Sequence, residues 1–158
     1  MEKNYLYVYS PDKLAFVPAE EWLKEPDPTR AELIGIQTEK GLLAWAKKGL
    51  GDHSFDEAQR VAAAYKVPLF GEFRCPTRRE FLDIQDIPGG LDALDELLDA
   101  IGGDTLRGDW LWTCERWLSR RNSASYGWLF SGTSGTLTTN YVYYANRVQA
   151  VTLLTDTI

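Results

Sequence analysis

The stretch "FRCPTRREFLDI", residues 73–84, predicts a helix near the centre of the chain. Thr77 and Glu80 have the spacing of a capping box, in which a hydroxyl accepts a free helical N–H and a carboxylate reaches back to the cap residue. Such a cap stabilises a helix by ~1 kcal/mol. We therefore expect a helix to begin directly after Thr77.

Two further segments have helical patterns. Ser54 and Glu57 repeat the capping-box spacing and open "FDEAQRVAAAYKV", residues 55–67, which Pro68 ends. Residues 91–103, "LDALDELLDAIGG", place apolar side chains three and four positions apart, and a glycine pair stops the helix. We interpret this apolar stripe as core packing; its members are Leu91, Leu94, Leu97, Leu98 and Ile101.

Strand patterns lie on both sides of the helical block. "NYLYVYS" alternates with a period of two and forms a predicted hairpin with "LAFVP". "AELIGIQT" and "GLLAWAKK" favour a second hairpin, although the latter could be a short helix. After residue 109 the strands are "WLWTC", "YGWLF", "TLTTN" and "RVQAVTLL". This order predicts an α+β fold, with antiparallel sheets flanked by two or three helices in one domain over residues 1–158.

Composition narrows the class of protein. The chain has 158 residues, 44% of them hydrophobic, which is typical of a folded domain and excludes a disordered chain. A net charge of −6 argues against a nucleic-acid binder, which needs a basic face for phosphates. The first residues lack a signal-peptide pattern, and no stretch resembles a membrane span. We expect a protein that is cytoplasmic at synthesis.

Residues with catalytic or metal-binding chemistry are few. Cys75 and Cys114 make no disulfide framework; a buried pair of thiols is favoured, with a single bridge if the fold brings them together. Neither cysteine combines with the lone His53 in a metal-ligand spacing. A catalytic cysteine also needs a base in reach. We therefore predict no catalytic residue, no metal site and no cofactor.

Residues 119–146 have an unusual composition. Ser, Thr, Asn and Tyr make up 16 of these 28 residues, and the segment contains no Lys, Asp or Glu. Tyrosine with small polar residues is typical of binding loops, because tyrosine offers a large contact area at a small entropic cost. An edge hairpin with a threonine-rich exposed face explains the composition equally well. Both interpretations stay open at this point.

Several motifs in order resemble those of bacterial C-type-lectin-like domains. They are "FRCPTRREFLDI", "WLWTCERW", "YGWLF", "SGTLTTNY" and "RVQAVTLL", and the resemblance covers residues 54–154, leaving 1–53 outside it. Cys75, Cys114 and Gln149 depart from the family's pattern. Within this fold, the chain is similar to the variable proteins of diversity-generating retroelements, in which error-prone copying randomises adenines in a C-terminal cassette.

The resemblance implies a division between scaffold and ligand-facing residues. Arg147 would be a structural anchor, and the buried scaffold would comprise Trp112, Trp128, Leu129, Phe130, Val148 and Val151. The ligand-binding surface would comprise Arg120, Arg121, Asn122, Ser123, Ser125, Tyr126, Ser131, Thr133, Ser134, Thr136, Thr138, Thr139, Asn140, Tyr141, Tyr143, Tyr144 and Asn146.

The implied function is recognition of a protein or cell-surface ligand through a diversified C-terminal surface, without catalysis. A fixed lectin-like adhesin or phage receptor-binding module is the alternative. An enzyme related to formylglycine generators is disfavoured, because that group uses cysteines near the C-terminus and this chain has none after Cys114. Display on a virion or cell through a partner stays open, and the sequence predicts neither the ligand nor the oligomeric state.

Overall fold

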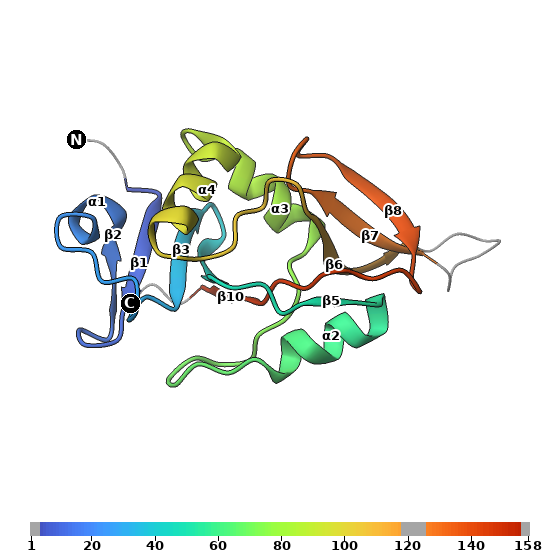
Figure 1. The fold of residues 1–158 in the computed structure, drawn as a ribbon, viewed down its shortest axis with the longest axis horizontal. Helices are drawn as coiled ribbons and strands as arrows, with labels where there is room; N and C mark the ends of the chain where they lie inside the picture. Colours follow the sequence, from blue (N-terminus) through green and yellow to red (C-terminus); the bar gives the residue numbers. More distant parts are fainter. Residues whose placement is uncertain (1–3, 118–125, 156–158) are drawn as a thin grey trace. The chain divides into compact units, whose positions relative to one another are not determined.

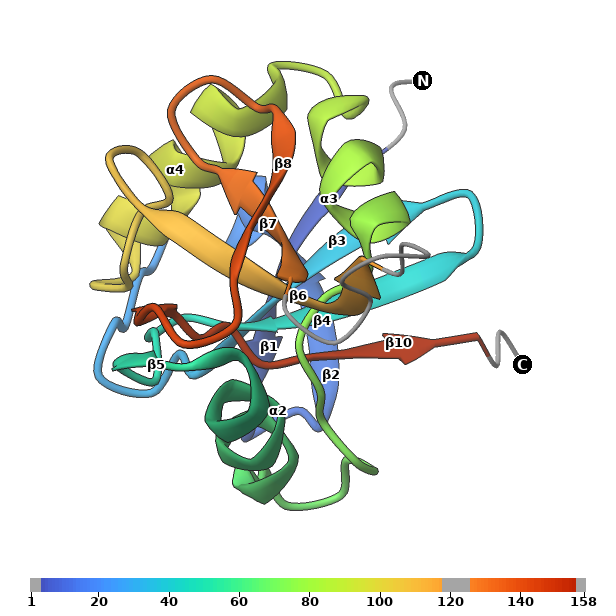
Figure 2. The same cartoon turned by 90° about the vertical axis from the view of Figure 1, so that its right-hand side faces the viewer.

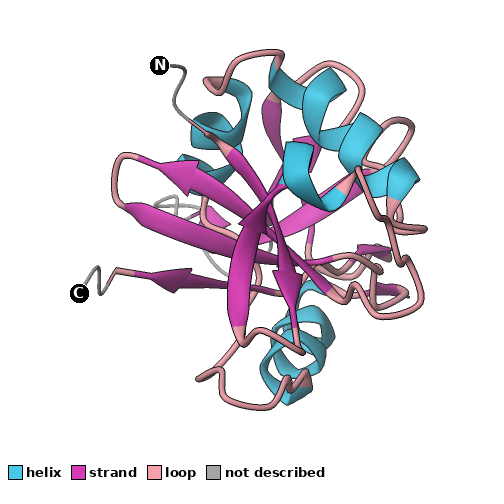
Figure 3. Ribbon diagram, turned by 90° about the vertical axis from the view of Figure 1, so that its left-hand side faces the viewer, coloured by secondary structure: helices cyan, strands magenta, loops and turns pink. Residues whose placement is uncertain are grey.

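The computed structural model describes residues 4–117 and 126–155. Within these residues the protein is a mixed α+β protein with four helices and two five-stranded sheets that are mainly antiparallel (Figure 3). The chain divides into two compact units, each made of separate segments. The first unit comprises Met1–Lys48, Asp83–Thr105 and Leu153–Ile158, and the second comprises Gly49–Leu82 and Leu106–Thr152.

The sheet of the first unit is built from two hairpins and the edge strand β10, and Figure 1 labels β1, β2 and β3 of this sheet. Its strand order is β10-β4-β3-β1-β2. Val8 pairs with Val17 in the first hairpin, and Ile34 pairs with Trp45 in the second. Both predicted hairpins are confirmed, and "GLLAWAKK" is a strand rather than a helix. The strands are β1 (Leu6–Ser10), β2 (Ala15–Pro18), β3 (Leu33–Thr38), β4 (Gly41–Ala46) and β10 (Val151–Leu154).

The apolar stripe of α4 (Gly90–Ala100) belongs to the core of the first unit. Leu94, Leu97, Leu98 and Ile101 are at most 4% exposed, which confirms the predicted packing face; Leu91 is half-buried. Beyond the helix, the backbone N–H of Asp104 donates to the carbonyl of Lys47 at 2.7 Å. The end of α4 is therefore tied to the end of the second hairpin.

The sheet of the second unit has the order β5-β9-β6-β7-β8. Strands β6, β7 and β8 form an antiparallel meander and lie side by side (Figure 2). The predicted single strand "RVQAVTLL" is wrong: it divides into β9 and β10, because Val148 bonds to Leu50 and Gly51 instead of continuing either strand. The strands are β5 (Asp52–His53), β6 (Trp110–Trp117), β7 (Tyr126–Ser131), β8 (Leu137–Tyr141) and β9 (Asn146–Arg147).

Only one of the two predicted capping boxes forms. At the start of α3 (Arg78–Gln85), the backbone N–H of Glu80 donates to Thr77 Oγ1 at 3.0 Å, and that of Thr77 donates to Glu80 Oε1 at 2.9 Å. The box at Ser54 is wrong: α2 (Phe55–Ala64) begins there without a side-chain cap, because the Glu57 carboxylate accepts from Arg60 instead. That helix also ends at Ala64, before the predicted end.

We expect Glu80→Gln to lower the free energy of unfolding by about 2 kcal/mol. The Glu80 carboxylate, 9% exposed, accepts two hydrogen bonds from the Arg74 guanidinium at 2.7 and 2.8 Å. Glutamine keeps the shape but removes the charge opposite Arg74. Glu57→Gln is the matched control, because Glu57 occupies the same position of α2 and its ion pair with Arg60 is exposed. Equal urea midpoints for the two variants would contradict this expectation.

Aromatic rings fill the core of the second unit. Phe81 of α3 stacks on Phe130 of β7 with ring centroids 4.3 Å apart, and Phe55 of α2 meets Trp112 of β6 edge to face at 5.3 Å. Of the scaffold residues implied by the family resemblance, all except Trp128 are buried. The expectation for Trp128 is wrong: its indole is half-buried, and the Arg78 guanidinium lies 4.5 Å from its centroid.

Candidate binding surface

Four aromatic side chains form a continuous row on the second unit. Trp117 of β6 pairs in register with Tyr126 of β7, and Tyr126 pairs with Tyr141 of β8. Their ring centroids lie 5.3 and 4.7 Å apart, and Tyr144 lies beyond β8 at 5.8 Å from Tyr141. These spacings are those of favourable aromatic pairs. We call Trp117, Tyr126, Tyr141 and Tyr144 the aromatic row.

The aromatic row is open to solvent although it is apolar. Trp117 is 37% exposed, Tyr141 45% and Tyr144 57%, while Tyr126 is half-buried. A side-chain hydrogen bond with Tyr141 raises the pKa of Tyr126 above its ordinary value. Contiguous exposed aromatic side chains on a folded protein mark interaction sites, whereas single exposed apolar residues carry no such meaning.

The alternation of β7 explains why the row is uncovered. Tyr126, Trp128 and Phe130 share one face of the strand, since side chains two apart point the same way. Phe130 is covered by Phe81 of α3, and Trp128 is partly covered by Arg78 at the start of that helix. The aromatic row lies on the same face of the strand, beyond Trp128 at the Tyr126 end. The helix therefore sets the boundary between core and open surface.

A bulge in β6 supports this end of α3. The register of β6 with β7 shifts between Trp112 and Arg116. The buried Thr113 hydroxyl lies 3.0 Å from the carbonyl of Trp128, to which it can donate, and accepts from the N–H of Glu115 at 3.0 Å. Glu115 Oε1 accepts the N–H of Arg78 at 2.7 Å. Burial raises the pKa of Glu115, but the hydrogen bonds from Arg78 outweigh it and hold the pKa below its ordinary value.

The predicted ligand-facing residues of β8 do not share one face. Thr139 pairs with Trp128 and lies on the side of the aromatic row, whereas Thr138 pairs with Leu129 and Asn140 with Gly127 on the opposite side. That side is closely packed near Gly127, where an added Cβ would come within 2.4 Å of Phe55. Thr138 is exposed and Asn140 half-buried. The strand therefore presents the predicted residues in two directions.

A second group of predicted residues lies in the β7–β8 turn, at the other end of both strands. Thr133, Ser134 and Thr136 are exposed, but their hydroxyls are engaged: Thr133 Oγ1 accepts from the N–H of Gly108 at 2.7 Å, and Ser134 Oγ lies 2.7 Å from Thr136 Oγ1. Ser131 is 4% exposed, and its hydroxyl accepts from the N–H of Ser134 at 3.2 Å. The prediction that Ser131 faces a ligand is wrong, because its hydroxyl holds the turn.

The remaining predicted residues belong to neither of these two groups. Tyr143 is 77% exposed in the turn after β8, and Asn146 is half-buried in β9. Arg147 is 6% exposed and donates to Asp109 at 2.9 Å and to Gln149 at 3.1 Å, as a structural anchor would. Five predicted residues lie outside the described residues: Arg120, Arg121, Asn122, Ser123 and Ser125. The sequence does not predict Trp117 as a binding residue, because its place beside Tyr126 depends on the register of β6 beyond the bulge.

Both cysteines are free thiols in the structure. Cys75 is fully buried and donates weakly to the carbonyl of Ala58 at 3.7 Å, whereas Cys114 is half-buried, so the predicted buried pair holds only for Cys75. Burial raises the pKa of the Cys75 thiol to about 12. Burial also raises the pKa of Cys114, against the opposing attraction of Arg74.

We expect both thiols to be protected from modification in the folded protein. The thiolate is the reactive form, so a pKa of about 12 leaves Cys75 roughly a thousand-fold less reactive at pH 8 than an exposed thiol. Cys114 should react faster than Cys75 but slower than a free thiol. Ellman's reagent measures both rates, with Cys114→Ser separating them. Unfolding in urea without reductant should release two thiols per chain; fewer would indicate a bridge.

Residues 4–117 and 126–155 contain neither a candidate metal-ligand cluster nor a helix that could span a membrane. In that part of the chain, no group of three or more His, Cys, Asp or Glu side chains could hold a metal ion. The same residues contain no helix with the length and apolarity needed to cross a bilayer.

No known protein-family model matches the chain, and no curated protein is significantly similar to it. The fold and the candidate site define a mixed α+β protein with two mainly antiparallel sheets and an exposed aromatic row on the second sheet.

Proposed function

We propose that the protein is a C-type-lectin-like binding protein whose C-terminal strands recognise a protein or a cell-surface ligand, without catalysis. One observation carries the proposal: three aromatic side chains on three hydrogen-bonded strands, continued by Tyr144 beyond β8, form a row that is open to solvent. We expect the protein to bind its ligand through a diversified C-terminal surface, as the variable proteins of diversity-generating retroelements do.

The chemistry of the row suits recognition. Tyrosine and tryptophan offer large contact areas with few rotatable bonds, so little conformational entropy is lost when they bind. Hot spots of protein interfaces are enriched in these two residue types. Trp117, Tyr126 and Tyr141 are anchored on strands, which lowers the cost of ordering them further. Tyr143 and Tyr144 extend the surface into the following turn.

A fixed adhesin or phage receptor-binding module is the second candidate. The β7–β8 turn favours it, because its hydroxyls hold the turn together. A position with such a role tolerates few replacements, whereas diversification requires tolerance. Under the diversified alternative, the variable positions are therefore expected among Thr138, Thr139, Asn140, Tyr141, Tyr143 and Tyr144, with Ser131 kept constant.

The gene's nucleotides distinguish the two candidates. A diversified surface requires AAC or mutated AAC codons at these positions, together with an adenine-rich near-copy of the cassette and a reverse transcriptase gene nearby. Sequencing the locus from several isolates should then show differences confined to these codons. Ordinary codon usage without a near-copy would contradict diversification and leave the fixed binding module.

A further inference from the structure

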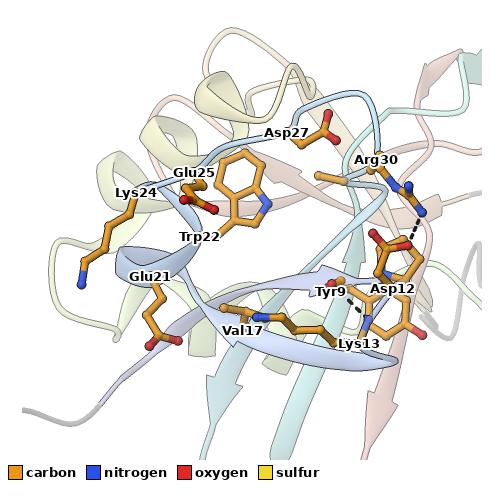
Figure 4. Close-up of a pocket in the computed structure, with 13 residues that line it drawn as sticks. Tyr9, Asp12, Lys13, Val17, Glu21, Trp22, Lys24, Glu25, Asp27 and Arg30 are labelled. Carbon is orange, nitrogen blue, oxygen red and sulfur yellow. Dashed lines mark hydrogen bonds and ion pairs between the residues drawn. The ribbon is translucent and has the colours of Figure 1, made fainter.

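A pocket of the first unit is separate from the aromatic row. Its cavity of about 540 Å³ is lined by the β1–β2 hairpin, by α1 (Ala19–Trp22) and by the loop that follows (Figure 4). This volume lies within the range of small-molecule sites. The pocket draws only on residues between Tyr9 and Ala31, which belong to one unit.

Trp22 provides the aromatic wall of the pocket. It is the last residue of α1 and is half-buried, whereas its neighbours Glu21 and Leu23 are exposed. In Figure 4 the Glu25 side chain lies beside the indole, and Asp27 lies on the loop above it. Tyr9, 8% exposed, lines the pocket from β1. An aromatic face next to carboxylates is the combination that binds organic cations.

The charges around the indole favour a cation. Arg30 is neutralised by an ion pair with Asp12. Within the described chain, the carboxylates of Glu21 and Glu25 form no ion pair, and Asp27 accepts one hydrogen bond from the Thr29 hydroxyl at 2.7 Å. Lys13 and Lys24 also line the pocket; in Figure 4 Lys24 extends away from the indole, and the Lys13 side chain lies next to Val17. The lining therefore has four carboxylates (Asp12, Glu21, Glu25 and Asp27) against three cationic side chains, an excess of one negative charge.

The charge of the whole first unit adds to this preference. Its segments contain sixteen Asp and Glu against seven Lys and Arg, a net charge of −9. The second unit contains seven acidic and ten basic residues, a net charge of +3. A field of this kind raises the local concentration of cations and speeds their association. The first unit is therefore the acidic part of the molecule and contains the aromatic pocket.

We propose that this pocket binds an alkylammonium group, with the cation against the Trp22 indole and with Glu25 and Asp27 as its counter-charges. The group would come from a lysine side chain of a basic partner peptide or from a free polyamine. This site is independent of the proposed recognition function, which rests on the second unit.

Binding can be followed at the indole itself. In a ¹⁵N-labelled protein the Trp22 indole gives one N–H cross-peak, assigned by its loss in Trp22→Phe, whose dispersed spectrum also shows that the variant is folded. We expect pentalysine to shift this cross-peak saturably and acetylated pentalysine to leave it in place. A parallel titration with spermidine identifies the source: a saturable shift with spermidine indicates a polyamine site, and a shift with pentalysine alone indicates a peptide site.

Paired variants test the counter-charges. Glu25→Gln with Asp27→Asn should weaken pentalysine binding about ten-fold, since two charge contacts of this kind contribute on the order of 1.4 kcal/mol together. The control, Glu39→Gln with Asp99→Asn, removes the same charge from exposed positions outside the pocket and should change affinity much less. Equal weakening by both pairs, a stationary Trp22 cross-peak, or an equal shift with acetylated peptide or inorganic phosphate would overturn the proposal.

Discussion

Phe130→Ala is expected to lower the free energy of unfolding by about 3–5 kcal/mol. The Phe130 ring is fully buried and stacks on Phe81 of α3 at 4.3 Å with an interplanar angle of 9°. Alanine removes the ring and leaves a cavity between β7 and α3, which the surrounding strands can fill only in part. Urea unfolding monitored by circular dichroism measures the change, and the transition should move to lower urea without loss of cooperativity.

Tyr144→Ala is the matched control for Phe130→Ala. It removes a ring of similar size that is 57% exposed and has one described aromatic neighbour, Tyr141. Its cost should stay within about 1 kcal/mol, because surface substitutions seldom exceed that value. The pair therefore separates scaffold from open surface without knowledge of the ligand. Equal destabilisation by the two variants would show that the aromatic row is part of the core, against the proposed function.

Gly132→Ala is expected to destabilise the second unit by roughly 3 kcal/mol, at the upper end of the cost of overpacking. A Cβ at this position would stand 1.9 Å from the carbonyl oxygen of Leu106 and 2.5 Å from its carbon. Relief requires movement of the backbone, and the backbone is held there because the N–H of Gly132 donates to the carbonyl of Asp109 at 2.9 Å. The turn that presents Thr133 and Ser134 would shift with it.

The control for Gly132→Ala is Gly71→Ala. A Cβ at Gly71 meets no atom within 4 Å, and its backbone requires no left-handed conformation. This variant should be neutral or slightly stabilising, because alanine reduces the entropy of the unfolded chain. Similar urea midpoints for the two alanine variants would show that the loop at Leu106 adapts, and would contradict the expected clash.

The charge of the two units has consequences for both proposed sites. The second unit, with a net charge of +3, carries the aromatic row, and the first unit, with a net charge of −9, carries the Trp22 pocket. A cationic ligand is therefore attracted to the first unit, and an anionic surface to the second. Binding at the pocket should weaken with added salt, whereas binding through the uncharged tyrosine side chains should depend on salt much less.

The candidate binding surface was predictable in composition but not in geometry. Tyr126, Tyr141, Tyr143 and Tyr144 were identified from the density of tyrosine and small polar residues, and the structure places them at one end of the β7–β8 pair. The same composition also included Ser131 and the turn hydroxyls, which serve the fold. Residue type alone does not tell a hydroxyl that holds a turn from one that faces a ligand.

The local elements follow from the amino-acid sequence alone. The Thr77–Glu80 box, the two N-terminal hairpins and the stripe of α4 follow from contacts between residues close in the chain, so their patterns are visible without the fold. The cap predicted at Ser54 does not form, because the Glu57 carboxylate accepts from Arg60 instead. A local sequence pattern therefore does not show which of two nearby partners a side chain binds. The α+β class follows from the order of these elements.

Which residues meet across the strands depends on the folded arrangement of the chain. The row from Trp117 to Tyr141 depends on the bulge in β6, whose extra residues no periodicity reveals, and on the register of three strands. The pocket beside Trp22 depends on a hairpin and a loop that meet around a four-residue helix. Both sites bring together residues distant in the chain or in irregular segments, where local propensity carries no information about distance.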